Sequence, residues 1–140
     1  MAITIDTTTP FGERAARRLR DEGLGWLVTV SPAGQPQPSR VWFEWDGDSV
    51  LLYSKPDTPK LRNIAANPRV ALHLDGDDLG GDLVILQGTA RVSDDPPADQ
   101  VPSYVEKYRA RMTRNGWSPA EFAGMYSVPL RVDPTRLRGH

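Results

Sequence analysis

Residues 50–64 read Val50-Leu51-Leu52-Tyr53-Ser54-Lys55-Pro56-Asp57-Thr58-Pro59-Lys60-Leu61-Arg62-Asn63-Ile64, an apolar strand that leads into the start of a helix. The first four residues have the composition of a strand, Thr58 is of a type that caps helices, and Pro59 suits the first helical position. The first N–H groups of a helix have no partner within it, and Lys60 adds an ammonium group beside them. We therefore predict an anion site here, best filled by a phosphate group.

The helix start at Thr58 and Pro59 also has a simpler interpretation. A Thr-Pro start is common, and Lys60 is then an ordinary solvated lysine of the first turn. A lysine near a helix N-terminus is slightly unfavourable, because the helix dipole prefers carboxylates there. A bound anion would offset this mismatch, which weakly favours the phosphate site.

Composition limits the class of protein. The chain has 140 residues, of which 39% are hydrophobic, and we expect one folded domain over residues 1–140. It has no apolar run of the about 18 residues that a membrane span needs. Residues 1–9 lack the pattern of a signal peptide, so we expect a cytoplasmic protein with no membrane partner. A net charge of −1 argues against a nucleic-acid partner.

The residue types that bind metals are scarce. The chain has no cysteine, which excludes disulfides and thiolate chemistry. The two histidines, His73 and His140, are far apart in the sequence and give no zinc pattern. The segment 75–82 is rich in aspartate and glycine, but it lacks the closing glutamate of a calcium loop, and we interpret it as a polar hairpin connection. We therefore expect no metal site.

Hydrophobic periodicity and turn residues predict six strands and several helices. Helices are expected at residues 10–22, 59–66 and 102–115, with a shorter one opened by the capping box Ser118-Pro119-Ala120-Glu121. Strands are expected at residues 24–31, 37–45, 49–54, 69–75, 83–92 and 126–132. Within the strand 83–92, Gly88 indicates a bulge or the close approach of another group. We predict an α+β fold, a six-stranded antiparallel barrel with short flanking helices, because closure removes the sheet edges.

The expected strand 37–45 has two different faces. One face should turn toward the core, and it carries Val41, Phe43 and Trp45. On the other face, Arg40 is either an exposed strand cation or a planar donor to an anionic cofactor. Trp42 shares that face and is left open as a packing residue or as a contact to a ring or substrate.

Short motifs follow one another along the chain in a characteristic order. They are Ser39-Arg40-Val41-Trp42-Phe43, Asp46-Gly47, Tyr53-Ser54, Lys60 with Asn63-Ile64, Asn67-Pro68, Val70 with Leu72, Gln87-Gly88-Thr89-Ala90 and the ending Val132-Asp133-Pro134-Thr135-Arg136-Leu137-Arg138-Gly139. Over residues 10–139 this order resembles the pyridoxamine 5'-phosphate oxidase-like split β-barrel flavoproteins, the FMN-binding split barrels. Within that superfamily it is similar to the F₄₂₀-dependent reductases found in actinobacteria.

The resemblance implies a homodimer of split barrels with two cofactor sites at the subunit interface. The implied cofactor is coenzyme F₄₂₀, with FMN as the alternative. The resemblance assigns the cofactor phosphate to Lys60 and Asn63, with Ser54, Lys55 and Thr58 alongside. It assigns the ring and its chain to the strand residues Ser39, Arg40, Val41 and Trp42, and it makes Gln87 a weaker candidate near the cofactor. The anion site expected from residues 50–64 coincides with the implied phosphate site.

The residues that usually carry acid, base or nucleophilic chemistry form no recognisable set in this sequence. That fits a protein whose cofactor supplies the reaction, and we name no catalytic residue. The resemblance implies hydride transfer between reduced F₄₂₀ and a small unsaturated organic acceptor. The C-terminal arginine and histidine pattern of true pyridoxamine phosphate oxidases is not found, which argues against oxidation of vitamin B6. Two alternatives stay open: an FMN-binding oxidoreductase of this superfamily, and a non-catalytic carrier or sensor of a flavin or deazaflavin.

Overall fold

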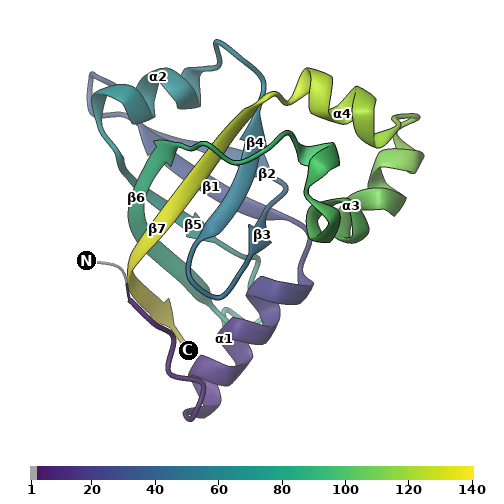
Figure 1. Ribbon diagram of the computed structural model, residues 1–140. Coiled ribbons are helices and arrows are strands. Elements are labelled where there is room, and N and C mark those ends of the chain that lie inside the picture. Colours follow the sequence, from purple (N-terminus) through teal and green to yellow (C-terminus); the bar gives the residue numbers. More distant parts are fainter. Residues whose placement is uncertain (1–2) are drawn as a thin grey trace.

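An antiparallel sheet of seven strands forms the centre of the protein in a computed structural model that describes residues 3–140 (Figure 1). Its strands are β1 (Gly25–Val30), β2 (Pro36–Val41), β3 (Glu44–Trp45), β4 (Val50–Ser54), β5 (Arg69–His73), β6 (Val84–Val92) and β7 (Val128–Gly139). They lie in the order β2-β1-β5-β6-β7-β4-β3, and the sheet curls into a half-barrel. The predicted α+β split-barrel fold is confirmed.

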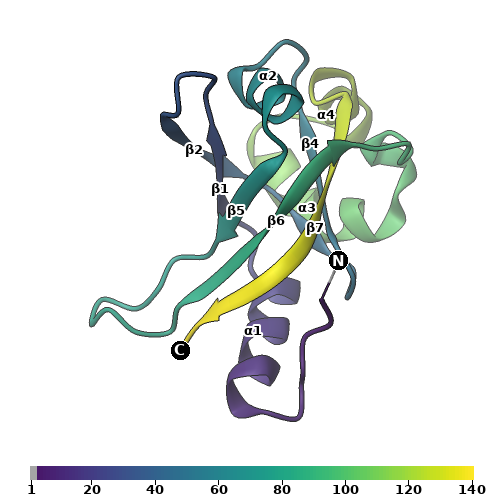
Figure 2. The ribbon, with the colours of Figure 1, turned by 90° about the vertical axis from the view of Figure 1, so that its left-hand side faces the viewer.

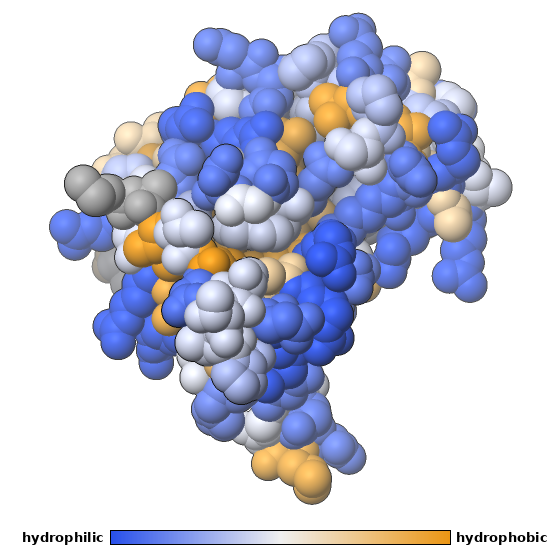
Figure 3. All heavy atoms as spheres, turned by 60° about the horizontal axis from the view of Figure 1, so that its bottom comes forward, coloured by the Kyte–Doolittle hydropathy of each residue, from blue (hydrophilic) through white to orange (hydrophobic). Residues whose placement is uncertain are grey.

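Within residues 3–140, four α-helices surround this sheet. They are α1 (Pro10–Asp21), α2 (Pro59–Ala66), α3 (Pro102–Arg114) and α4 (Pro119–Met125), with a 3₁₀ turn at Ala98–Gln100. Figures 1 and 2 show α1 at one end of the half-barrel, α2 at the other, and α3 and α4 together on one side. From the end that α1 covers, the surface is mainly hydrophilic (Figure 3). Helix α4 begins at the predicted capping box of Ser118 and Glu121.

The strand count differs from the predicted six, because the expected strand 37–45 is interrupted. The backbone N–H of Phe43 donates to the hydroxyl group of Tyr108 at 2.6 Å, and the ammonium group of Lys107 donates to the Phe43 carbonyl at 2.7 Å. Both side chains belong to α3, and they bond the N–H and carbonyl groups of Phe43 that a neighbouring strand would otherwise pair. The chain therefore leaves β2 at one edge of the sheet and enters β3 at the opposite edge.

Strand β7 is longer than the expected strand 126–132, because Pro134 does not end it. Pro134 lies opposite Gly88, next to a register shift between Gln87 and Gly88. A Cβ atom at Gly88 would lie 2.3 Å from the carbonyl oxygen of Asp133. The predicted bulge and close approach at this glycine are both confirmed, and the bulge accommodates a proline within a paired strand.

Two apolar clusters hold the elements together. The first fills the half-barrel and includes the buried Val41 and Phe43, whereas Trp45 is half-buried and packs only against its margin. The expectation that Trp45 lies in the core is thus met in part. The second cluster lies between β4 and the pair α3 and α4, and it contains Trp42 at its edge.

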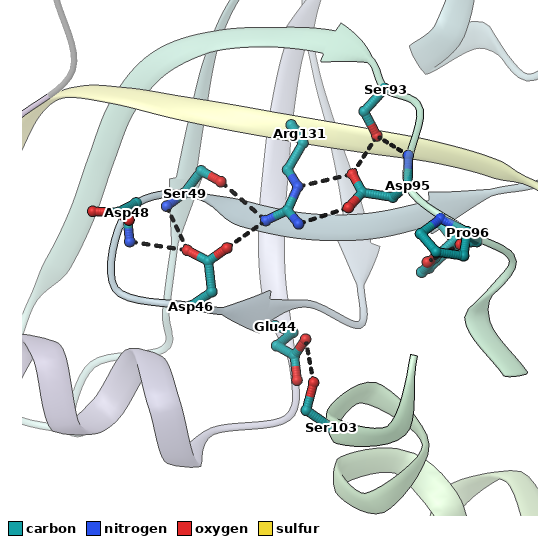
Figure 4. A network of polar contacts seen from close by, with 10 residues as sticks. Glu44, Asp46, Asp48, Ser49, Ser93, Asp95, Pro96, Ser103 and Arg131 are labelled. Carbon is teal, nitrogen blue, oxygen red and sulfur yellow. Dashed lines mark hydrogen bonds and ion pairs between the residues drawn. The ribbon is translucent and has the colours of Figure 1, made fainter. Parts of the chain in front are cut away.

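A polar network ties β7 to the turn between β3 and β4 and to the segment after β6 (Figure 4). The guanidinium group of Arg131 donates to both carboxylate oxygens of Asp95, at 2.9 and 2.7 Å, and to Asp46 at 2.7 Å. The bonds from Arg131 lower the pKa of the Asp95 carboxyl below its ordinary value. The network fixes the chain that leads from β6 to α3.

The sequence predicts no membrane span, and it predicts a barrel whose closure removes the sheet edges. None of the helices within residues 3–140 combines the length and apolar character needed to cross a bilayer. The sheet keeps two edges, contrary to the expected closure. Strand β2 lies at one of them, and its Pro36 and Pro38 are exposed. Proline lacks the N–H group that a central strand uses for pairing, and an edge strand tolerates this loss on its unpaired side.

Candidate functional site

Two neighbouring hollows share Lys60, in the first turn of α2. The first, which we call the aromatic pocket, has a volume of about 200 Å³ and lies between the sheet and the α3–α4 pair. Its lining residues are Arg40, Val41, Trp42 and Tyr53 from the sheet, Lys60 from α2, and Asn115, Trp117, Phe122 and Tyr126 from the α3–α4 region. The second, the helix-start pocket, has a volume of about 330 Å³. It is lined by Thr29, Gln37, Pro38, Ser39, Thr58, Pro59 and Lys60.

Lys60 is half-buried, and burial lowers the pKa of its ammonium group below the ordinary value. No carboxylate within residues 3–140 forms an ion pair with it. A partly desolvated cation without a counter-ion is unfavourable, and a bound anion would remove that cost. The position of Lys60 thus supports the anion site predicted from the sequence.

Thr58 occupies the N-cap position of α2, but its side chain makes no capping hydrogen bond, contrary to the prediction. Its hydroxyl group lies 3.0 Å from that of Ser54, which donates in turn to the carbonyl oxygen of Lys55 at 2.8 Å. The two hydroxyl groups therefore stabilise the turn between β4 and α2. At the start of α2 Pro59 has no N–H group, and the N–H groups of Leu61 and Arg62 donate to the Thr58 carbonyl at 3.2 and 3.3 Å. Within residues 3–140 the backbone N–H of Lys60 is therefore the donor that no cap has taken.

Asn63 is buried, and its side-chain amide is already bonded. It donates to the hydroxyl group of Thr29 at 2.9 Å and to the side-chain oxygen of Gln37 at 2.7 Å. Both partners line the helix-start pocket. In this structure Asn63 therefore fixes the wall of that pocket from behind.

The predicted residues of β2 divide between the two hollows. Ser39 lines the helix-start pocket, and Arg40, Val41 and Trp42 border the aromatic pocket. The guanidinium group of Arg40 pairs with Asp75 at 3.1 Å and lies 5.0 Å above the ring of Trp26. Its charge is therefore already matched.

The ring of Trp42 stacks on two other aromatic rings. Its centre lies 4.8 Å from that of Tyr108, with only 1° between the planes, and 5.1 Å from that of Phe122, at 12°. Offset stacking of this kind adds to the stabilisation that burial provides. Trp42 is thus both a packing residue and a fixed wall of the pocket.

Lys55 and Gln87, two more of the predicted residues, line neither hollow. Lys55 is exposed, and its ammonium group lies 5.4 Å above the ring of Tyr126, at the rim of the aromatic pocket. Gln87 is in the middle of β6 between the buried Leu86 and Gly88, so its side chain turns to the outer face of the sheet. The structure of one chain brings six of the ten predicted residues to the lining of the hollows, and Gln87 is not among them.

Sequence reasoning missed the aromatic residues of the α3–α4 region. The short helix α4 was predicted from its capping box, and it contains or adjoins Trp117, Phe122 and Tyr126. That all three line one pocket depends on how this helix packs against the sheet. Tyr53 was assigned only to a strand. Its hydroxyl group donates to the carbonyl of Pro96 at 2.6 Å, and burial raises the pKa of Tyr53 to about 12, so it stays protonated.

Comparison with known proteins matches this geometry to one family. The family model described as pyridoxamine 5'-phosphate oxidase matches residues 11–139, and the chain belongs to that family. An F₄₂₀ reductase structure is similar at 30% identity with a TM-score of 0.61, over 87% of this chain and 94% of that chain. These findings confirm the predicted resemblance to the superfamily and support its F₄₂₀-dependent branch.

Two further structures show how varied proteins of this fold are. A conserved hypothetical protein from Mycobacterium tuberculosis has 28% identity and a TM-score of 0.70, over 90% of this chain and 81% of that chain. A haem storage protein from Vibrio cholerae has 14% identity and a TM-score of 0.61, over 98% of this chain and 95% of that chain, a likeness of fold alone. Because one fold hosts several functions, the function of this chain has to be argued from its site.

Proposed function

We propose that this protein is an oxidoreductase that binds coenzyme F₄₂₀ and transfers a hydride between the reduced cofactor and a small unsaturated organic acceptor. The observation that carries the proposal is Lys60, a half-buried ammonium group without an ion pair in the described chain, at a helix start that no side chain caps. The 30% identity to an F₄₂₀ reductase supports the choice of cofactor.

Residues of the chain would bind and position the cofactor. The ammonium group and the backbone N–H of Lys60 would bind its phosphate, with Ser54 and Thr58 shaping the turn and Asn63 fixing the pocket wall. The segment 39–42 of β2 would lie along the ring and its chain. When bound, reduced F₄₂₀ supplies a hydride, which with one proton from solvent reduces a conjugated acceptor by two electrons and leaves the cofactor oxidised. The apolar walls of the aromatic pocket would exclude water from the acceptor.

The proposal includes a homodimer with cofactor sites at the subunit interface, as the resemblance implies. In such a dimer Gln87 and Lys55 would approach the cofactor only if the interface brings them there. Sedimentation velocity on the purified protein measures the oligomeric state, and a monomer at micromolar concentration would contradict this part of the proposal.

Two alternatives use the same anion site. FMN also carries a phosphate group, so an FMN-dependent oxidoreductase would bind it through Lys60. A non-catalytic carrier would bind either cofactor but would not turn over. Mixing the protein with reduced cofactor and an added acceptor separates an enzyme, which oxidises the cofactor quickly, from a carrier.

The first experiment is a paired fluorescence titration of the purified protein with F₄₂₀ and with FMN. Tight F₄₂₀ binding with weak FMN binding is the expected result, and the reverse order would replace F₄₂₀ by FMN. Lys60→Ala should weaken binding by about 1–3 kcal/mol, because a charge-assisted contact is lost. Arg69→Ala is the control, an exposed cation at the start of β5 that lines neither hollow. An unchanged dissociation constant in Lys60→Ala would refute the site assignment.

A further inference from the structure

Lys107, a half-buried residue of α3, places its ammonium group at the break between β2 and β3. This group donates to the carbonyl oxygen of Phe43 at 2.7 Å. It lies 4.4 Å from the centre of the Phe43 ring and 5.5 Å from that of the Tyr108 ring. Within residues 3–140 no carboxylate forms an ion pair with it. The closest partners of this cation are therefore neutral groups.

These surroundings favour the neutral amine of Lys107. Burial lowers the pKa of its ammonium group to about 8, although Glu44 of β3 favours the charged form, as do Asp21 and Glu22 at the end of α1. Arg111, one turn further along α3, disfavours it. At about pH 7.5 roughly a quarter of the Lys107 side chains are neutral, against about one in a thousand for a lysine of ordinary pKa. The neutral amine is the form that attacks a carbonyl carbon.

The chain has two other lysines, Lys55 and Lys60, and their surroundings differ from those of Lys107. Lys55 is exposed, so water stabilises its charged form. Lys60 is half-buried, but it lies at the predicted anion site, where a bound anion would keep it charged. Lys107 is thus the lysine that best combines a neutral amine with access to solvent.

The neighbours of Lys107 also select the kind of reagent that can approach it. The carboxylates of Glu44, Asp21 and Glu22 lie on its side of the molecule, so they repel a reagent with a negatively charged reacting end, such as an acyl phosphate. The rings beside the amine are uncharged. An acyl thioester has an uncharged reacting end and is therefore the better match.

We propose that Lys107 is a site of covalent acylation by acyl thioesters, and that its acylation loosens the contact of α3 with the break between β2 and β3. The amine nitrogen attacks the thioester carbonyl carbon, a C–N bond forms and the C–S bond breaks. The thiol leaves with the proton that the amine loses. The product is a neutral amide, which keeps one N–H group for the Phe43 carbonyl but no longer places a charge over the two rings.

The rate of acylation at each lysine tests the site on the folded protein. The probe is S-acetyl-N-acetylcysteamine, a small uncharged thioester. After each incubation the protein is unfolded in guanidinium chloride and the remaining amines are blocked with deuterated acetic anhydride, so that mass spectrometry gives the fraction of each lysine that the thioester has acetylated. At about pH 7.5 Lys107 should react at least about tenfold faster than Lys55, the exposed control. At about pH 10 the ratio should fall close to one, because the amine of Lys55 is then largely neutral too and a less basic amine is the weaker nucleophile.

The variant Lys107→Arg tests the effect on the break between β2 and β3. Arginine keeps the charge at this position, but it is not acylated under these conditions. After the same treatment with the thioester, the urea midpoint of the wild type should fall. That of Lys107→Arg should stay at its untreated value, since only Lys55 and Lys60 remain to react.

Three results would contradict the proposal. Equal rates at Lys107 and Lys55 at about pH 7.5, or a faster reaction at Lys60, would overturn the assignment of the site. A ratio that is the same at both pH values would mean that access alone sets the rates, which also overturns it. Equal shifts of the urea midpoint in the wild type and Lys107→Arg would overturn the effect on the break. None of these measurements uses the cofactor, so the proposed function stands or falls separately.

Discussion

Tyr104 and Tyr108 lie one turn apart on α3, both side chains are fully buried, and their hydroxyl groups have opposite surroundings. The Tyr108 hydroxyl accepts from the backbone N–H of Phe43 at 2.6 Å and lies 2.8 Å from the carbonyl oxygen of Gly23. The Tyr104 hydroxyl has no hydrogen-bond partner in the described part of the chain. Burial raises the pKa of both groups, so both are neutral at physiological pH. Removing each hydroxyl group should therefore have opposite consequences.

The magnitudes follow from these partners. Tyr108→Phe leaves the N–H of Phe43 buried without an acceptor, and we expect the free energy of unfolding to fall by about 1–3 kcal/mol. Tyr104→Phe removes a hydroxyl group that is buried without compensation, so stability should be unchanged or higher by up to about 1 kcal/mol. Both substitutions keep the ring, and the stacking of the second apolar cluster is preserved in each.

Urea unfolding followed by far-UV circular dichroism measures both variants against the wild type. The midpoint should drop for Tyr108→Phe and stay or rise for Tyr104→Phe, with the slope of the transition unchanged in both. Equal losses in the two variants, or a larger loss in Tyr104→Phe, would refute the reasoning.

Three further changes test other parts of the structure. Gly88→Ala forces a Cβ atom against the carbonyl oxygen of Asp133 on the facing strand and should lower the free energy of unfolding by about 1–3 kcal/mol. The control Thr89→Ala, at an exposed position, should change it little, and equal melting temperatures in the two variants would contradict the close approach at the bulge. Asn63→Ala removes the donor to the buried hydroxyl group of Thr29 and to the side-chain oxygen of the exposed Gln37, and it should lower stability by about 1–3 kcal/mol. A neutral result in urea would show that the amide is not structural. Arg131 lowers the pKa of the Asp95 carboxyl in the folded protein, so the Asp95–Arg131 pair contributes fully to stability above the unfolded-state pKa of about 4, and this contribution is lost as the pH falls through the lower folded-state pKa. In Asp95→Asn the urea midpoint should therefore depend less on pH between about pH 5 and pH 2. The same pH dependence in the variant as in the wild type would count against this.

Local sequence signals predicted the parts of the fold that neighbouring residues determine. Helix α2 has the expected bounds, because Thr58, Pro59 and the Asn67-Pro68 stop act within a few residues. Gly88 was recognised because a glycine inside a strand weakens it and is therefore typical of a bulge or of a closely approaching backbone. The anion site at Lys60 follows from the same local logic and stays a prediction. In the described chain Lys60 is half-buried and forms no ion pair.

Features that depend on distant residues were missed or misplaced. The break at Phe43 depends on the hydroxyl group of Tyr108, which is 65 residues away in the sequence, and no pattern of residues near Phe43 predicts it. The capping bond expected of Thr58 is absent for a local reason, because its hydroxyl group bonds to that of Ser54 instead. The walls of the aromatic pocket come from β2, β4 and the α3–α4 region together. Residues such as Trp117 therefore meet at one pocket only when these elements pack against each other.

The two prolines of β2 have a consequence for the behaviour of the protein at high concentration. An edge strand with free N–H groups is a template on which another chain can pair and begin to aggregate. Pro36 and Pro38 remove two such donors from the β2 edge, and β3, at the opposite edge, is only two residues long. The two edges of the half-barrel thus offer few unpaired backbone groups to a strand of another molecule. Edge-to-edge aggregation is therefore disfavoured although the sheet does not close into a full barrel.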